Sequence, residues 1–311
     1  MTDTTPATIG WIGAGRMGFA LAARLLDAGY DVAVYNRTRS KAEPLEARGA
    51  TIVDRPLDLA NRDVVFTMVS APKDLEEVIG GEGGLLTAES STPTVIIDSS
   101  TVSGESSARI RALATERGSQ FLAAPVSGNP AVISAGKLTV AVSGPRETFD
   151  AVKPILSVLG CGVTWVGEGE VARLVKIAHN VFLGIVTEAL AEITVLAERG
   201  GVSREAFLEF LNDSVMGSTF TRYKTPAFVN LDFAPTFTMP LLSKDFDLGL
   251  EAAHELAVPM PIAAATAQIV ASAIGAGYRT EDFATLLLEQ ARRAGITLAS
   301  EDAHVLSGLE V

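Results

Sequence analysis

Hydrophobic residues along this chain recur with two different spacings, and one spacing replaces the other near residue 167. In the first half, short apolar runs alternate with segments of helical periodicity such as 19–28. The runs are predicted as strands over 7–12, 31–35, 51–53, 64–69, 94–98, 120–124, 138–142 and 163–166. Because strands and helices alternate, we predict an α/β fold whose sheet is parallel or mostly parallel, with helices on both faces.

Beyond residue 200 the apolar residues recur only with helical spacing. Helices are predicted over 204–213, 241–255, 262–276 and 281–293. The stretch 214–240 contains Gly217 and three prolines, and it is predicted as a long loop of the kind that usually carries function. If this loop borders a cleft, Arg222 and Lys224 can reach an anionic substrate. Solvated surface charge is the commoner state of such residues.

The segment 167–199 joins the two halves. After the Gly-Glu-Gly turn at 167–169, it is predicted as one helix about 43 Å long, at about 1.5 Å per residue. Gly184 is the only helix breaker between this turn and Gly200. Apolar residues lie nearly all round it, which predicts a helix buried between other elements.

Four polar residues lie near the start of this apolar helix. Lys176 and Asn180 are four residues apart and therefore share one face, with Arg173 one turn before them and His179 beside them. A helical lysine commonly extends its stem until the ammonium reaches solvent. The alternative is an ammonium held in a cleft, where desolvation moves its pKa toward neutral and lets it exchange protons with a substrate. The helix alone leaves both interpretations open.

A glycine-rich turn follows the first predicted strand and opens a predicted helix. Its six residues are Gly13, Ala14, Gly15, Arg16, Met17 and Gly18. In this context the first glycine makes a tight turn and the second lets the backbone approach a pyrophosphate. The third lets helix and strand pack closely, while the helix N-terminus supplies N–H groups and a positive dipole. We therefore predict dinucleotide binding.

The end of the second predicted strand indicates which dinucleotide binds. Residues 35–40 read YNRTRS, with no carboxylate to accept hydrogen bonds from the ribose hydroxyls of NAD. Two guanidiniums and two hydroxyls suit a 2′-phosphate dianion instead. The sequence predicts NADP, contacted by Asn36, Arg37 and Thr38. The alternative is a solvated basic loop.

Residues after the other predicted strands are rich in hydroxyls and turn formers. Ligands of parallel sheets lie at the carboxyl ends of the strands, which directs attention to three segments. They are Met68, Val69 and Ser70, then 98–101 ending in Thr101, then Ser127 and Gly128. Helix capping by Ser and Thr is the structural alternative for Ser70, Ser99 and Ser100. At Ser127 and Gly128 a hydroxyl and backbone N–H groups can hold a small anion.

Composition narrows the class of protein. The 311 residues are 48% hydrophobic with a net charge of −12, which favours a soluble globular protein and argues against a nucleic-acid surface. One cysteine fits a reducing cytoplasm, and three histidines without ligand spacing predict no metal site. Residues 1–6 resemble no signal peptide, and the run 262–276 is too short to span a bilayer, so no membrane role is expected.

Taken in order, these motifs resemble the β-hydroxyacid dehydrogenase family, the group of 3-hydroxyisobutyrate, tartronate semialdehyde and 6-phosphogluconate dehydrogenases. The resemblance runs from residue 8 to about 287 and rests on GWIGAGRMG, YNRT, DSST, APVSG, GKL, GEGEVARLVKIAHN and LLSKDFDLGL. It implies a Rossmann domain over 1–166, a long interdomain helix over 167–199 and an all-helical domain over 200–311. Two subunits are expected to pair through the helical domains.

The resemblance also implies roles for residues. Lys176 corresponds to the family's catalytic lysine, and Asn180 corresponds to the asparagine that accompanies it. Ser127 and Gly128 hold the substrate carboxylate. Thr101 lies near the nicotinamide, and Lys244 closes over the cofactor with Asp245 beside it.

Two positions depart from the family pattern. Asn129 and Pro130 follow Gly128 where the family has a second glycine, which places a side-chain amide near the expected substrate. His179 gives the order Lys-x-x-His-Asn, which is similar to the 6-phosphogluconate enzymes. His179 is interpreted as a substrate-contacting or supporting residue, and a satisfied buried histidine is the alternative.

We therefore predict an NADP-dependent oxidoreductase for a small anionic 3-hydroxy acid. The alternatives are an imine reductase of the same architecture and a non-catalytic NADP-binding module.

Overall fold

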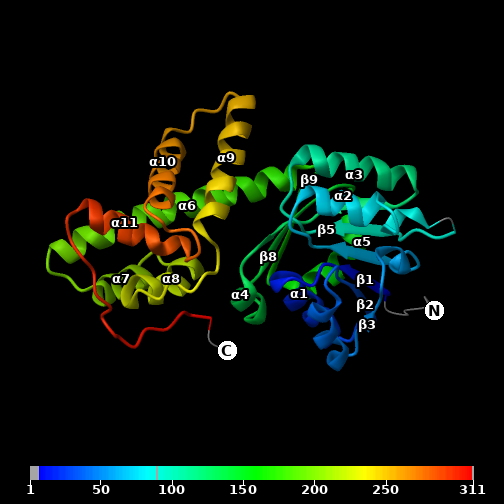
Figure 1. Cartoon of the computed structure of the whole chain (residues 1–311), viewed down its shortest axis with the longest axis horizontal. Coiled ribbons are helices and arrows are strands. Elements are labelled where there is room, and N and C mark those ends of the chain that lie inside the picture. The colour runs from blue at the N-terminus through cyan, green and yellow to red at the C-terminus, as the bar shows by residue number, and fades with distance from the viewer. Residues whose placement is uncertain (1–6, 89, 310–311) are drawn as a thin grey trace. The chain divides into compact units, whose positions relative to one another are not determined.

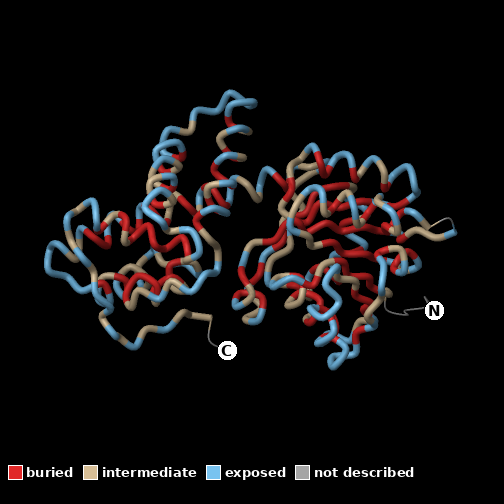
Figure 2. The backbone as a smooth tube through the Cα atoms, in the orientation of Figure 1, coloured by how far each residue is buried: buried red, intermediate tan, exposed pale blue. Residues whose placement is uncertain are grey.

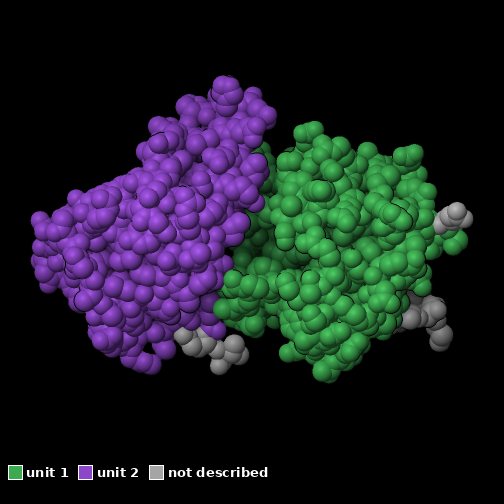
Figure 3. Space-filling model, viewed as in Figure 1, with its two compact units in different colours: residues 1–176 green, residues 177–311 purple. Residues whose placement is uncertain are grey.

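The computed structural model describes residues 7–88 and 90–309, so the expectation about residues 1–6 lies outside the described part. The chain forms two compact units, residues 1–176 and 177–311 (Figure 3). The division falls inside helix α6 (Val171–Arg199), within the segment predicted as the interdomain helix.

A twisted sheet forms the centre of the first unit (Figure 1). Its strands are β1 (Ile9–Ile12), β2 (Val32–Tyr35), β3 (Thr51–Ile52), β4 (Val64–Thr67), β5 (Val95–Asp98), β6 (Gln120–Ala123), β7 (Val126–Ser127), β8 (Thr139–Ser143) and β9 (Gly162–Gly167). The order β3-β2-β1-β4-β5-β6 is parallel throughout, and β8 joins β6 and β7 antiparallel and β9 parallel. This is the strand order of a dinucleotide-binding Rossmann fold, as predicted. The two-residue strand β7 was not predicted.

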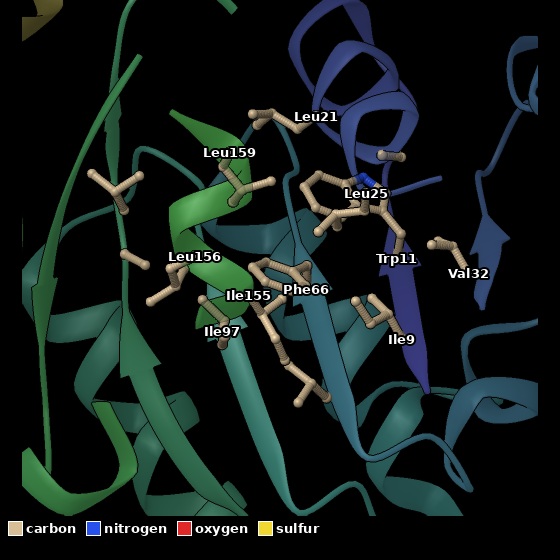
Figure 4. Packing of buried hydrophobic residues seen from close by; sticks show 14 of the residues in the cluster. Ile9, Trp11, Leu21, Leu25, Val32, Phe66, Ile97, Ile155, Leu156 and Leu159 are labelled. Atoms are coloured by element: carbon tan, nitrogen blue, oxygen red, sulfur yellow. The ribbon is translucent and has the colours of Figure 1, made fainter. Parts of the chain in front are cut away.

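Side chains on successive strand residues pack into separate cores on the two faces of the sheet. Ile9, Trp11 and Phe66 point to one face, where they meet Leu21 of α1 (Arg16–Asp27) and Leu156 of α5 (Arg146–Leu159) (Figure 4). The neighbouring strand residues point to the other face, covered by α2 (Pro72–Gly80) and α3 (Gly104–Glu116). Burial on both faces explains why these strands read as continuous apolar runs.

The second unit is built from helices, as predicted. They are the later part of α6, then α7 (Arg204–Asp213), α8 (Thr219–Asn230), α9 (Met239–Glu255), α10 (Pro261–Gly275) and α11 (Leu286–Arg293). The predicted loop 214–240 is wrong over its middle, because α8 occupies it. Ser218 and Thr221 form a capping box at the start of this helix, which continues through Pro226. The predicted helix 281–293 begins instead as a 3₁₀ turn, Phe283–Thr285, before α11.

Helix α6 is only half buried, so the prediction of burial all round it is wrong. Phe182, Ile193 and Leu196 are 65%, 41% and 72% exposed in the chain, and Ala189 is exposed between them. These positions recur at i, i+7, i+11 and i+14, which places them along one stripe. Figure 2 shows buried and exposed positions mixed along the helices of the second unit. α6 is also long and apolar enough to cross a membrane by length and composition alone, yet half of that window is buried inside the fold.

Two glycines let α6 and α9 approach closely. A Cβ on Gly184 of α6 would lie 2.5 Å from the Phe246 ring, and one on Gly249 of α9 would lie 2.4 Å from the Val181 side chain. Each glycine is four residues beyond a polar residue, Asn180 on α6 and Asp245 on α9. The close crossing therefore brings these two polar side chains together.

The buried part of α6 contains a carboxyl group, that of Glu188. Glu188 is 4% exposed, and neither of its carboxylate oxygens has a hydrogen-bond partner among the described residues. Burial, with the carboxylates of Glu192 and Glu289 adding repulsion, raises the pKa of Glu188 from 4.5 to about 7, against the opposing effect of Arg293. Glu188 is therefore protonated in the fold near pH 6, where the unfolded chain has it ionised.

This raised pKa predicts a pH-dependent loss of stability. Glu188 binds its proton more tightly in the folded state than in the unfolded state, so this proton stabilises the fold. The stabilisation is complete below about pH 4.5 and is lost as the pH rises through about 7. We compare the free energy of unfolding of Glu188→Gln with that of the unsubstituted protein. We expect the difference in favour of the variant to grow by about 2 kcal/mol when the pH is raised from about 5.5 to about 8. Urea unfolding at both pH values measures this, with Glu209→Gln, an exposed glutamate of α7 that is not among the groups acting on Glu188, as control. A stability difference that does not change with pH would contradict it.

Candidate functional site

The glycine turn after β1 has the shape that its sequence predicts. Gly13 has φ +101°, and a Cβ there would lie 2.2 Å from the Met68 carbonyl oxygen. A Cβ on Gly18 would lie 1.9 Å from the Gly13 carbonyl oxygen, so the third glycine is required for α1 to pack on the turn. Nothing lies within 4 Å of a Cβ on Gly15, at the N-cap of α1. Tight packing on two sides and open space at the helix N-terminus fit a bound pyrophosphate.

Asn36 joins this turn to the end of β2. Its Oδ1 accepts a hydrogen bond from the Ala14 N–H at 2.8 Å, and its Nδ2 donates to the Thr38 carbonyl at 2.7 Å. The side chain therefore shapes the turn from outside. Arg16 and Met17 continue into the first turn of α1.

A groove runs from this turn across the ends of β1, β2 and β4. It is lined by Ile12, Gly13, Gly15, Tyr35, Asn36, Arg37, Thr38, Lys41, Pro56, Met68, Val69, Ser70, Asp74, Glu77, Val78 and Glu82. The structure thus brings most of the predicted cofactor contacts to one surface. The lining also includes Lys41, which was not predicted. Its basic character and its position five residues beyond Asn36 were the available signals.

The charged groups in this groove have both signs. Arg37 and Lys41 come from the β2 side, while Asp74, Glu77 and Glu82 come from α2 and the residues after it. Arg37 forms an ion pair with Asp74, at 3.0 Å between Nη1 and Oδ1. The second predicted guanidinium, Arg39, instead pairs with Asp54 and Glu43 and is not among the lining residues.

Polar contacts fasten the ends of β4 and β5 to each other. The Thr67 hydroxyl donates to Asp98 Oδ1 at 2.6 Å, and the Val69 N–H donates to the Ser100 hydroxyl at 2.9 Å. Ser100 therefore joins two strand ends and does not cap a helix. Thr101 follows directly and is partly buried.

Arg173 ties the start of α6 to these strand ends. Its side chain is 3% exposed, and its Nη2 lies 2.5 Å from Asp98 Oδ2. Nη1 donates to the Ser100 carbonyl at 2.6 Å, and Nη2 to the Ser107 hydroxyl of α3 at 2.9 Å. The planar fork of a guanidinium can satisfy several acceptors at once. The first turn of α6 is thereby fixed to the loop that carries Thr101.

Lys176 lies one turn beyond Arg173 and is partly buried. Asn180 is 5% exposed, and its amide is held on both sides. Nδ2 donates to Asp245 Oδ2 of α9 at 2.6 Å, and Oδ1 lies 3.1 Å from His179 Nδ1. The His179 side chain is exposed, which contradicts the alternative of a buried, satisfied histidine.

The KD pair of α9 has one exposed and one buried member. Lys244 is 46% exposed at its side chain, and its Nζ lies 3.6 Å from Asp245 Oδ1. Asp245 is 2% exposed, and Oδ1 has no hydrogen-bond partner among the described residues. The contact of Asp245 with Asn180 could not be found from the sequence.

The predicted anion-binding segment begins at the end of β7. Gly128 has φ +145°, and a Cβ there would lie 2.8 Å from Val132, so only glycine fits. Asn129 caps helix α4 (Pro130–Ser134), because its Oδ1 accepts from the Val132 N–H at 3.0 Å. Its side-chain oxygen is thus engaged in the fold, and the hydroxyl of Ser127 and the backbone remain the predicted anion contacts.

Two basic residues that were considered as substrate contacts have structural partners. Lys224 is 2% exposed and pairs with Asp282 at 2.5 Å, with the Thr236 hydroxyl 3.0 Å away. The Arg222 guanidinium donates to the Asn212 carbonyl. Neither prediction for Lys224, substrate contact or solvated charge, is compatible with this buried pair. Within the described residues, no cluster of three or more His, Cys, Asp or Glu could hold a metal ion.

Comparison with known proteins gives matches over nearly the whole chain. A family model described as the NAD binding domain of 6-phosphogluconate dehydrogenase matches residues 8–167. A second, described as NAD-binding of NADP-dependent 3-hydroxyisobutyrate dehydrogenase, matches residues 167–289.

Individual relatives agree with these models. The chain is 33% identical to 2-(hydroxymethyl)glutarate dehydrogenase of Eubacterium barkeri, over 94% of this chain and 97% of the relative. It is 30% identical to glyoxylate/succinic semialdehyde reductase 1 of Arabidopsis thaliana, over 90% and 96%. The crystal structure of 3-hydroxyisobutyrate dehydrogenase from Salmonella typhimurium matches with a TM-score of 0.80 and 25% identity, over 91% and 99%.

Proposed function

The chain belongs to the β-hydroxyacid dehydrogenase family, and from this membership we propose that it is an NADP-dependent dehydrogenase or reductase of a small anionic 3-hydroxy acid. One structural observation supports the proposal in addition to the family membership. Arg173 binds the helix that carries Lys176 to the end of β5, and hydrogen bonds from Thr67 and Val69 join that end to β4, whose end borders the dinucleotide groove. An acid–base group and a cofactor site are thereby built on one rigid support.

The cofactor, when bound, supplies the hydride acceptor or donor at nicotinamide C4. Lys176 takes the proton of the alcohol when the substrate is oxidised and returns it to the carbonyl oxygen when the substrate is reduced. Asn180 orients the substrate oxygen beside this lysine, and its own orientation is set by Asp245. Ser127 and Gly128 anchor the substrate anion, Thr101 contacts the nicotinamide side, and Lys244 covers the cofactor.

The relatives support the substrate class. Their names describe oxidation or reduction of small hydroxy acids and semialdehydes, which are anions with a carbinol or carbonyl carbon. An imine reductase of this architecture is the second candidate in the same fold. Lys176 argues against it, because the family resemblance gives those enzymes a different residue at this position.

Removal of the ammonium at position 176 tests the acid–base role. We expect Lys176→Ala to lower kcat by about 10²- to 10⁴-fold, the usual effect of losing a positioned acid–base group, while the Kd of NADPH stays within about twofold. Steady-state kinetics with a panel of hydroxy acids, semialdehydes and imines, beside a fluorescence titration of NADPH, measures both. Full turnover in the variant would exclude the role, and turnover of imines alone would favour the second candidate.

Reversal of charge at position 37 tests the cofactor preference. Arg37→Asp replaces a phosphate-binding guanidinium with a carboxylate that accepts hydrogen bonds from ribose hydroxyls. We expect the ratio of NADP to NAD affinity to fall by about 10-fold or more, since each lost charge-assisted contact contributes about 1.5–3 kcal/mol. Arg39→Asp is the matched control, because Arg39 is paired with Asp54 and Glu43. An unchanged ratio in Arg37→Asp would exclude NADP selection by this residue.

We also propose that two subunits pair through the exposed stripe on α6 formed by Phe182, Ala189, Ile193 and Leu196. An apolar stripe of this length on a folded chain is typical of a protein interface. We expect the double substitution Ile193→Asp and Leu196→Asp to convert a dimer to a monomer in analytical ultracentrifugation. Leu256→Asp, an equally apolar exposed position outside the stripe, should leave the dimer intact. An unsubstituted protein that is monomeric at about 10 μM would refute the pairing.

A further inference from the structure

We propose that Asp74 is a specificity-determining residue of the dinucleotide groove, acting against the 2′-phosphate of NADP and in favour of the ribose hydroxyls of NAD. The inference rests on the proposed function, because it assigns a residue to the same cofactor site. Its location is α2, which faces the end of β2 across the groove.

The carboxylate that the end of β2 lacks is supplied by another element. Asp74 lies in the first turn of α2, after Pro72, and lines the same groove as Asn36, Arg37 and Thr38. Its Oδ1 lies 3.0 Å from Arg37 Nη1, and its side chain is 25% exposed where that of Arg37 is 76% exposed. The groove therefore places a carboxylate within one ion-pair distance of the guanidinium expected to bind the phosphate.

Asp74 affects NADP in two opposing ways. Its ion pair with Arg37 orients the guanidinium, but a pair this exposed contributes little to holding a side chain in place. The carboxylate also repels the 2′-phosphate dianion bound to the same guanidinium. For a carboxylate about 7 Å from a dianion in water, Coulomb's law gives a repulsion equivalent to roughly five- to tenfold in affinity. Repulsion is the larger effect, so Asp74 weakens NADP binding.

Asp74 acts on NAD in the opposite direction. A carboxylate beside the adenosine ribose accepts hydrogen bonds from its hydroxyl groups, which is how dinucleotide folds usually select NAD. The other charged residues of the groove also have both signs. Its described lining has two cations, Arg37 and Lys41, against three carboxylates, Asp74, Glu77 and Glu82. The site is therefore built for a limited preference between the two cofactors.

The test measures Kd for NADPH and NADH by fluorescence titration with the full chain, at about 0.01 M salt so that screening is weak, for the unsubstituted protein and for Asp74→Asn. We expect Asp74→Asn to bind NADPH about five- to tenfold more tightly and NADH more weakly, so that the two affinities move in opposite directions. Glu77→Gln is the matched control, because it removes one charge from the next turn of α2. Its effect on the ratio should be less than half that of Asp74→Asn.

The possible outcomes separate this proposal from the proposed function. Unchanged affinities in Asp74→Asn, or equal shifts in Asp74→Asn and Glu77→Gln, would overturn the assignment to Asp74 and leave the enzyme assignment in place. Failure of the unsubstituted protein to bind either dinucleotide would overturn the proposed function itself. A melting temperature near that of the unsubstituted protein confirms that each variant is folded.

Discussion

The buried ion pair between Arg173 and Asp98 is the interaction on which the proposed chemistry depends. The guanidinium connects α6 with α3 and the end of β5, and Asp98 in turn accepts a hydrogen bond from Thr67 of β4. Loss of one partner of a buried pair leaves an uncompensated charge and typically costs about 3–5 kcal/mol. A proton-transfer group must be held within a fraction of an ångström of its working position. The need for such a rigid connection explains why the charged side chain of Arg173 is buried in the core.

A second buried contact fixes the same face of α6 about two turns further on. Gly184 and Gly249 let α6 and α9 approach until Asn180 and Asp245 form a hydrogen bond of 2.6 Å. Lys176 lies between the two anchors, with Arg173 before it and Asn180 after it. Each anchor belongs to a different compact unit. The part of α6 that carries Lys176 is therefore held by independent interactions on both sides of this residue.

The elements of the fold were predictable wherever a local pattern dictates them. The alternation of apolar runs gives the parallel sheet, and β1 with its glycine turn has the predicted form because only glycine allows the contacts at positions 13 and 18. Helix α8 was missed because prolines and glycine suggested a loop, whereas a capping box and tertiary packing maintain the helix. Burial of α6 was overestimated, since apolar periodicity does not tell whether each face of a helix is covered within the chain.

The sequence by itself determined the family and the dinucleotide turn, and it placed Lys176 and Asn180 on one face of a helix. The tertiary structure alone decided which distant side chains meet. It showed that Arg173 pairs with Asp98 and Asn180 with Asp245, that Lys224 is buried with Asp282, and that Asp74 faces Arg37. These partners are 37 to 75 residues apart. The physical reason is that local propensity acts over a few residues, whereas charge pairing is set by how whole elements pack.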